Sequence, residues 1–154
     1  MFNNRICIVT GAAQGIGKEI TDRFANNEAE MVYALDMNEA ELNAAYAGRA
    51  NITPKALNVC DRDAIAALIE EIKAKFGRVD ILVNNAGITR DNLLDRMSEK
   101  DWDMVIDVNL KGVFNMTQAV APLMIENNYG SVITMSSVVG TDGNIGQSNY
   151  AATK

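Results

Sequence analysis

Short apolar runs alternate with stretches of helical periodicity along the chain. The runs predict five buried strands, at residues 6–9, 31–35, 56–59, 79–83 and 132–135. Between them, apolar side chains recur at the spacing of one face of an amphipathic helix. Strands that alternate with helices indicate an α/β protein whose parallel sheet is covered on both faces. Because crossovers between parallel strands are right-handed, we predict a doubly wound parallel sheet.

The turn that follows the first strand is rich in glycine. It runs from Thr10 to Gly17 and leads into a helix with an apolar series of Ile16, Ile20 and Phe24. Glycine lets the backbone turn tightly and lets a phosphate approach it, and the helix start offers unpaired N–H groups to an anion. We predict the pyrophosphate cradle of a Rossmann-type βαβ unit, formed by Gly11, Gln14, Gly15, Ile16 and Gly17. A tight turn without a ligand is the alternative.

Capping residues mark the predicted helix ends. Asp61 can cap a helix that Gly77 closes, and Ser98 with Asp101 forms a capping box before a long helix. The inward face of the long helix is predicted to consist of Trp102, Val105, Ile106, Leu110, Val113 and Phe114. We expect one dinucleotide-binding domain over residues 1–154. We expect it to be truncated after the fifth strand, at the start of the following helix, with its C-terminal part missing.

Composition excludes several classes of function. The 154 residues carry a net charge of −6 and no basic cluster, which argues against nucleic acid or an anionic membrane as a partner. The absence of histidine removes Ser-His-Asp hydrolysis and most zinc sites, so no metal site is expected. Cys7 and Cys60 are isolated thiols, as in a reducing compartment. We see neither a signal peptide nor a membrane span, so a cytoplasmic location is expected.

Polar residues follow the second and third predicted strands. Asp36 comes nineteen positions after Gly17, where an acidic side chain can accept hydrogen bonds from a ribose and repel a 2′-phosphate. Because Gln14 adds no cation inside the turn, we expect NAD(H) to be preferred over NADP(H). The third predicted strand ends at Asn58 and Val59. The Asn58 amide and the Val59 N–H could recognise adenine by hydrogen bonds. Two alternatives stay open. Asp36 could be an acidic residue at the N-terminus of the next helix, and Asn58 could hydrogen-bond to the polar groups of a loop.

Amides follow the fourth predicted strand and enter the long helix. Asn84-Asn85-Ala86-Gly87 combines small residues, over which a cofactor can lie, with two amides that can pin neighbouring loops. Asn109 falls between Val105 and Val113 and is expected to point inward, where a buried amide must be hydrogen-bonded. A plain turn and a purely structural amide are the alternatives.

The last segment carries candidate acid–base chemistry. Ser137 follows the fifth predicted strand, and Tyr150 and Lys154 stand four residues apart, on one face of a helix. An ammonium beside a phenol favours the phenolate, which makes Tyr150 usable as a general acid or base. Ser137 can donate a hydrogen bond to a carbonyl oxygen. An exposed Tyr–Lys pair without a catalytic role is the alternative.

In their order and spacing, these motifs resemble the short-chain dehydrogenase/reductase family along the whole chain. The resemblance implies a catalytic tetrad of Asn109, Ser137, Tyr150 and Lys154. In it Ser137 orients the substrate oxygen, Tyr150 transfers the proton, Lys154 also holds the nicotinamide ribose, and Asn109 binds a relay water. Hydride passes between the nicotinamide and the carbonyl carbon. Residues implied for the cofactor also include Asn85, Ala86 and Gly87.

The segments 85–94 and 137–141 look very like those of the β-ketoacyl acyl-carrier-protein reductases of fatty acid biosynthesis, and Gln147 before Tyr150 fits them as a substrate residue. The implied reaction is reduction of a 3-oxoacyl thioester. Those enzymes usually prefer NADPH and dock an acidic carrier protein through cations, whereas the segment 126–129 has none, so a carrier partner stays open. We expect a homo-oligomer at full length. The alternatives are a dehydrogenase of a small polyol, sugar or hydroxy acid, and a non-catalytic nucleotide-binding fragment.

Overall fold

The computed structural model describes residues 2–154 and holds one five-stranded sheet in the order β3-β2-β1-β4-β5. Every neighbouring pair of strands in it is parallel. The strands are β1 (Ile6–Thr10), β2 (Met31–Asp36), β3 (Ile52–Ala56), β4 (Ile81–Asn84) and β5 (Ser131–Thr134). The predicted α/β class and parallel sheet are confirmed.

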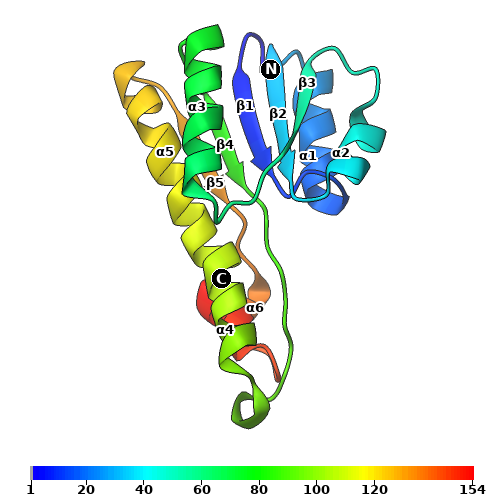
Figure 1. Cartoon of the computed structure of the whole chain (residues 1–154), viewed down its shortest axis with the longest axis vertical. Helices are drawn as coiled ribbons and strands as arrows, with labels where there is room; N and C mark the ends of the chain where they lie inside the picture. Colours follow the sequence, from blue (N-terminus) through cyan, green and yellow to red (C-terminus); the bar gives the residue numbers. More distant parts are fainter. Residues whose placement is uncertain (1) are drawn as a thin grey trace.

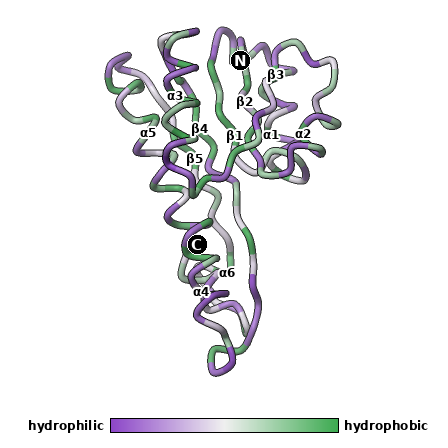
Figure 2. Tube along the Cα trace, in the orientation of Figure 1, coloured by the Kyte–Doolittle hydropathy of each residue, from purple (hydrophilic) through white to green (hydrophobic). Residues whose placement is uncertain are grey.

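Helices cover both faces of the sheet (Figure 1). Helices α1 (Gly15–Asn26) and α2 (Glu39–Tyr46) pack on one face, and α3 (Arg62–Phe76) and α5 (Gly112–Glu126) pack on the other. Alternate residues of β1, β2 and β4 enter the two hydrophobic clusters, and Figure 2 shows apolar strands between helices in which polar and apolar residues alternate. The doubly wound arrangement is confirmed. None of the helices within residues 2–154 is long and apolar enough to cross a bilayer.

Beyond the carboxyl ends of the strands, the chain forms an arm that projects from the sheet (Figure 1). The arm contains η1 (Leu94–Arg96), α4 (Glu99–Ile106), α6 (Val138–Asp142) and α7 (Ser148–Thr153). Two distant segments are joined there, because the Asn92 N–H donates to the Gly146 carbonyl over 2.9 Å and the Asn149 amide donates to the Arg90 carbonyl over 2.9 Å. The arm therefore holds the segment after β4 against the segment after β5.

The predicted helix caps are present. The Asp61 carboxylate accepts from the Ala64 N–H over 3.0 Å at the start of α3, and Gly77 ends that helix with a φ of 70°. The Ser98 hydroxyl oxygen accepts from the Asp101 N–H over 3.1 Å at the start of α4. These ends were readable from the sequence because each depends on residues within one helical turn.

The third strand was placed wrongly, and two others were shifted. The strand is Ile52–Ala56, and residues 57–59 lie past its end, where the Leu57 N–H donates to the Asp36 carbonyl over 2.8 Å. The strand lies at the edge of the sheet, where Pro54 is tolerated and polar residues are half-exposed, so it lacks an apolar run. Strands β4 and β5 are shifted by a residue or two from their predicted bounds.

The long helix is not regular, and its predicted inward stripe is partly wrong. A π-helical segment, η2 (Asp107–Lys111), separates α4 from α5. Leu110 and Phe114 follow Val105 by five and nine residues, which on a regular helix is about 140° and 180° around the axis from it. Val105 is fully buried, whereas Leu110 and Phe114 are 50% and 55% exposed. Ile16, the first member of the apolar series in α1 and a predicted cofactor residue, is 63% exposed.

Both cysteines are free thiols. Cys7 lies in the middle of β1 with no exposed surface, and burial, helped by the charge of Asp80, raises the pKa of its thiol to about 12. Cys60 is half-buried, and burial also raises the pKa of its thiol. The expectation of isolated thiols without a disulfide is confirmed.

Asp80 joins the amino ends of β1 and β4. One carboxylate oxygen accepts from the Ile6 N–H over 2.7 Å and from Arg78 over 3.2 Å, and the other accepts from Arg5 over 3.1 Å. The residue is only 3% exposed. A buried carboxylate of this kind is stabilised only while these donors face it.

We predict that Asp80→Ala lowers the free energy of unfolding by about 2–4 kcal/mol, since the buried Ile6 N–H loses its acceptor. Urea denaturation of the protein measures this value. Asp95→Ala is the matched control. The Asp95 side chain is 74% exposed, and its ion pair with Arg96 is long, at 3.8 Å, so it contributes little to stability. The control should shift the value by less than about 0.5 kcal/mol. Equal losses in both variants would contradict the prediction.

Candidate active site

The glycine turn is closed by contacts that exclude side chains. Gly11 has a φ of 65°, and a Cβ there would lie 2.9 Å from the Cα of Ala86. A Cβ on Gly17 would overlap the Gly11 carbonyl oxygen. The start of α1 therefore packs directly on the turn, and both glycines are required for the observed backbone.

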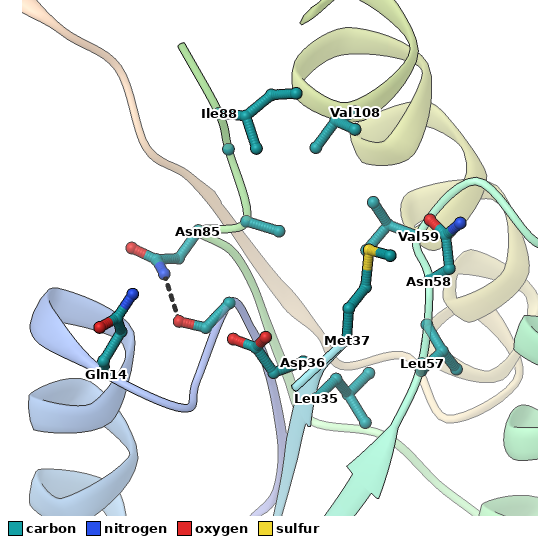
Figure 3. A pocket seen from close by; sticks show the side chains of 13 residues that line it. Gln14, Leu35, Asp36, Met37, Leu57, Asn58, Val59, Asn85, Ile88 and Val108 are labelled. Atoms are coloured by element: carbon teal, nitrogen blue, oxygen red, sulfur yellow. Dashed lines mark hydrogen bonds between the residues drawn. The ribbon is translucent and has the colours of Figure 1, made fainter. Parts of the chain in front are cut away.

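Thr10 and Asn85 clasp the turn to the end of β4. The Thr10 hydroxyl oxygen accepts from the N–H groups of Asn85 and Ala86, both over 3.0 Å. In return, the Asn85 amide donates to the carbonyl oxygens of Thr10 and Gly11 over 3.0 and 3.1 Å, the second of which is drawn in Figure 3. The predicted pinning of neighbouring loops by these amides is confirmed for Asn85.

A crevice of about 420 Å³ opens at the carboxyl ends of the strands, above this clasp (Figure 3). Eight residues predicted to bind the cofactor line it, namely Gly11, Gln14, Asp36, Asn58, Val59, Asn85, Ala86 and Gly87. Five lining residues were not predicted, namely Leu35, Met37, Leu57, Ile88 and Val108. Positions at strand ends could have indicated the first three. Val108 lies in η2, and no signal in the sequence marked it as a lining residue.

The crevice suits an elongated ligand with an anionic centre. Gln14 precedes α1 without making a capping hydrogen bond, so the first N–H groups of the helix stay available to an anion. Among residues 2–154, Asp36 supplies the only charged side chain that lines the crevice. Its two oxygens accept from the backbone N–H groups of Ala13 and Asn38, both over 3.1 Å, which fixes the carboxylate at the crevice wall.

A second hollow of about 300 Å³ adjoins the first. The two share three lining residues, Asn85, Gly87 and Ile88. The other residues around the second hollow are Ile16, Thr89, Met135, Ser136, Tyr150 and Lys154. The exposed position of Ile16 is thereby explained, because this side chain lines the hollow instead of the core.

Tyr150 and Lys154 meet in the second hollow. Both are half-buried, and the Lys154 Nζ lies 5.8 Å from the centroid of the Tyr150 ring. The ammonium donates to the Met135 carbonyl over 2.8 Å, and burial lowers the pKa of Lys154. A Cβ on Gly87 would lie 3.8 Å from Nζ, so the ammonium stands beside the strip shared by both hollows.

The other predicted catalytic and substrate residues line neither hollow. The Ser137 hydroxyl accepts from the Val139 N–H over 3.2 Å at the start of α6. Asn109, 2% exposed as predicted for an inward amide, accepts from the Ile88 N–H over 2.8 Å and donates to the Ile88 carbonyl over 2.9 Å. The Gln147 amide donates to Asp91 over 3.0 Å.

No group of three potential acidic, cysteine or histidine ligands that could hold a metal ion occurs within residues 2–154. The sequence of residues 5–154 matches the profile of the short chain dehydrogenase family. The chain belongs to this family. A nicotinamide cofactor follows from membership, and the glycine cradle, the open end of α1 and the long crevice fit such a dinucleotide. The resemblance stated from the motifs is confirmed.

Curated relatives share the family. The chain is 53% identical over 157 residues to the 3-oxoacyl-(acyl-carrier-protein) reductase FabG of Thermotoga maritima. It is 47% identical over 154 residues to the protein of that name from Escherichia coli, and in each case 99% of this chain is covered. The chain spans 63% of the length of these relatives.

We predict that Gly17→Ala weakens the binding of ADP-ribose at least about tenfold, because the added methyl group forces the turn away from α1. Isothermal titration calorimetry measures the dissociation constant. Gly48→Ala is the control, since Gly48 does not line the crevice and has nothing within 4 Å of the new methyl group. Its φ of 75° adds a backbone strain that Gly17 does not have, so the control tests for a general loss of stability. An unchanged constant for Gly17→Ala would contradict the proposed fit.

Proposed function

We propose that the protein is a nicotinamide-dependent reductase of 3-oxoacyl thioesters. A hydride passes to the C3 carbonyl carbon of the substrate, a proton passes to its oxygen, and a 3-hydroxyacyl thioester is formed. The observation that carries the proposal is the position of Tyr150 and Lys154 in a hollow that shares a wall with the long crevice. The names of the curated relatives support the choice of substrate class.

Different residues along the crevice would hold different groups of the cofactor. Gly11, Gln14, Gly15, Ile16 and Gly17, with the N–H groups of α1, would hold the pyrophosphate. Asp36 would accept from the adenosine ribose, and Asn58 with Val59 would contact the adenine. The strip Asn85-Ala86-Gly87 leads from there to Tyr150 and Lys154, which would hold the nicotinamide ribose.

The proposed chemistry assigns one task to each residue of the tetrad. When bound, the reduced nicotinamide supplies the hydride. Tyr150 donates its hydroxyl proton to the carbonyl oxygen, and the adjacent Lys154 ammonium stabilises the phenolate that remains. Ser137 donates a hydrogen bond to the same oxygen, and Gln147 contacts the rest of the substrate. Asn109 fixes Ile88 through two hydrogen bonds and retains a lone pair on Oδ1 for a relay water.

We expect Tyr150→Phe to lower kcat for acetoacetyl-CoA by at least about 100-fold, because it removes the transferred proton and little volume. Oxidation of NADH or NADPH by the full-length protein is followed by absorbance. Tyr129→Phe is the matched control, since this tyrosine is exposed and its ring packs on Arg5, away from both hollows. Full activity of Tyr150→Phe, or turnover of polyols without turnover of the thioester, would contradict the proposal.

We also propose that NADH is preferred over NADPH. The carboxylate of Asp36 is fixed at the crevice wall, and within the described part of the chain no cationic side chain lines the crevice to attract a 2′-phosphate. Removing the charge with Asp36→Asn should raise the ratio of kcat/KM for NADPH over NADH about tenfold. The surface variant Asp95→Asn, with the same change in charge, should leave the ratio unchanged. A natural preference for NADPH would defeat this part of the proposal alone.

For the full-length protein we propose a homo-oligomer acting on acyl thioesters. The exposed apolar side chains of Trp102, Leu110 and Phe114 on α4, η2 and α5 support self-association. The acyl group is proposed to arrive on coenzyme A or an acyl carrier protein. Comparing acetoacetyl groups on the two carriers separates them, because only a docked carrier protein would lower KM below that of coenzyme A.

A further inference from the structure

Asn115 on α5 is a buried amide with two defined partners. It is 3% exposed, and its Nδ2 donates to the Val59 carbonyl over 3.0 Å. Its Oδ1 accepts from the Arg62 guanidinium over 2.9 Å. Only this orientation of the amide is possible, because the reverse would place NH₂ against a cation and an oxygen against a carbonyl.

The segment that Asn115 contacts forms one wall of the crevice. Leu57, Asn58 and Val59 line the crevice and lie past the end of β3. The side chain of Val59 packs against Gly112, where a Cβ would lie 2.6 Å from Val59 Cγ2. Helix α5 thus holds Val59 twice, at its side chain through Gly112 and at its carbonyl through Asn115.

Other contacts of the segment come from the sheet and from within its own turn. The Leu57 N–H donates to the Asp36 carbonyl over 2.8 Å, and the Asn58 side chain accepts from the Cys60 N–H over 3.0 Å. The second contact limits rotation of the peptide that carries the Val59 carbonyl, because both groups belong to one planar unit. Asn115 supplies the polar link between that peptide and α5.

We propose that Asn115 is a positioning residue for the adenosine half of the cofactor. It acts through Val59 and lines no part of the crevice itself. The inference rests on the proposed function, in which Asn58 and Val59 contact the adenine. Losing the hydrogen bond lets the wall move and weakens binding of the adenosine half, while the end of the site at Tyr150 and Lys154 keeps its geometry.

The test is Asn115→Asp compared with Gln118→Glu in the full-length protein. Both variants add one negative charge beside Arg62, because the Gln118 Oε1 accepts from the same guanidinium over 2.6 Å. Only Asn115→Asp replaces the donor to the Val59 carbonyl with an acceptor. Dissociation constants are measured for ADP-ribose, and kcat/KM is measured for NADH and for reduced nicotinamide mononucleotide, which lacks the adenosine half.

We expect Asn115→Asp to raise the dissociation constant of ADP-ribose about tenfold, the effect of one lost hydrogen bond to a buried carbonyl. Gln118→Glu should change it less than twofold, and neither variant should change kcat/KM with reduced nicotinamide mononucleotide. Equal changes in both variants, or an equal loss with the mononucleotide and NADH, would overturn the positioning role alone. Failure of the unaltered protein to bind ADP-ribose would overturn the proposed function with it.

Discussion

The site depends on the direct contact between the glycine turn and the end of β4. No side chain separates Gly17 from the Gly11 carbonyl, and four hydrogen bonds join Thr10 and Gly11 to Asn85 and Ala86. The contact brings the start of α1 and the strip 85–87 to one edge of the sheet. Without the contact between the glycine turn and β4, the residues at the base of the crevice would separate. The second hollow would then lose the lining residues that it shares with the crevice.

The arm has a different role from the sheet. It is built from two segments that follow β4 and β5, and hydrogen bonds from Asn92 and Asn149 hold them together. Asn109 adds a third link, because its amide holds both polar groups of the Ile88 backbone. The arm carries Tyr150 and Lys154, so their position relative to the crevice depends on the buried amides of Asn109 and Asn149 and on the hydrogen bond from Lys154 to the Met135 carbonyl after β5.

Local signals predicted much of this architecture. The apolar runs of β1 and β2, the caps at Asp61 and Ser98 and the glycine at the end of α3 were all readable, because each depends on neighbours in sequence. The edge strand β3 was not readable in the same way. Its residues are half-exposed, and the apolar residues that follow it belong to the crevice wall and the core beneath it.

The sequence by itself determined the family, the glycine cradle and the spacing of Tyr150 and Lys154, since these are motifs in which residue type and separation dictate backbone and face. Only the tertiary structure decided that Leu110 and Phe114 are exposed, that Ile16 lines a hollow and that Asn115 holds the Val59 carbonyl. Those features arise where one helix meets a loop far away in sequence. No local pattern encodes them, because the free energy of each contact depends on what the rest of the chain brings opposite it.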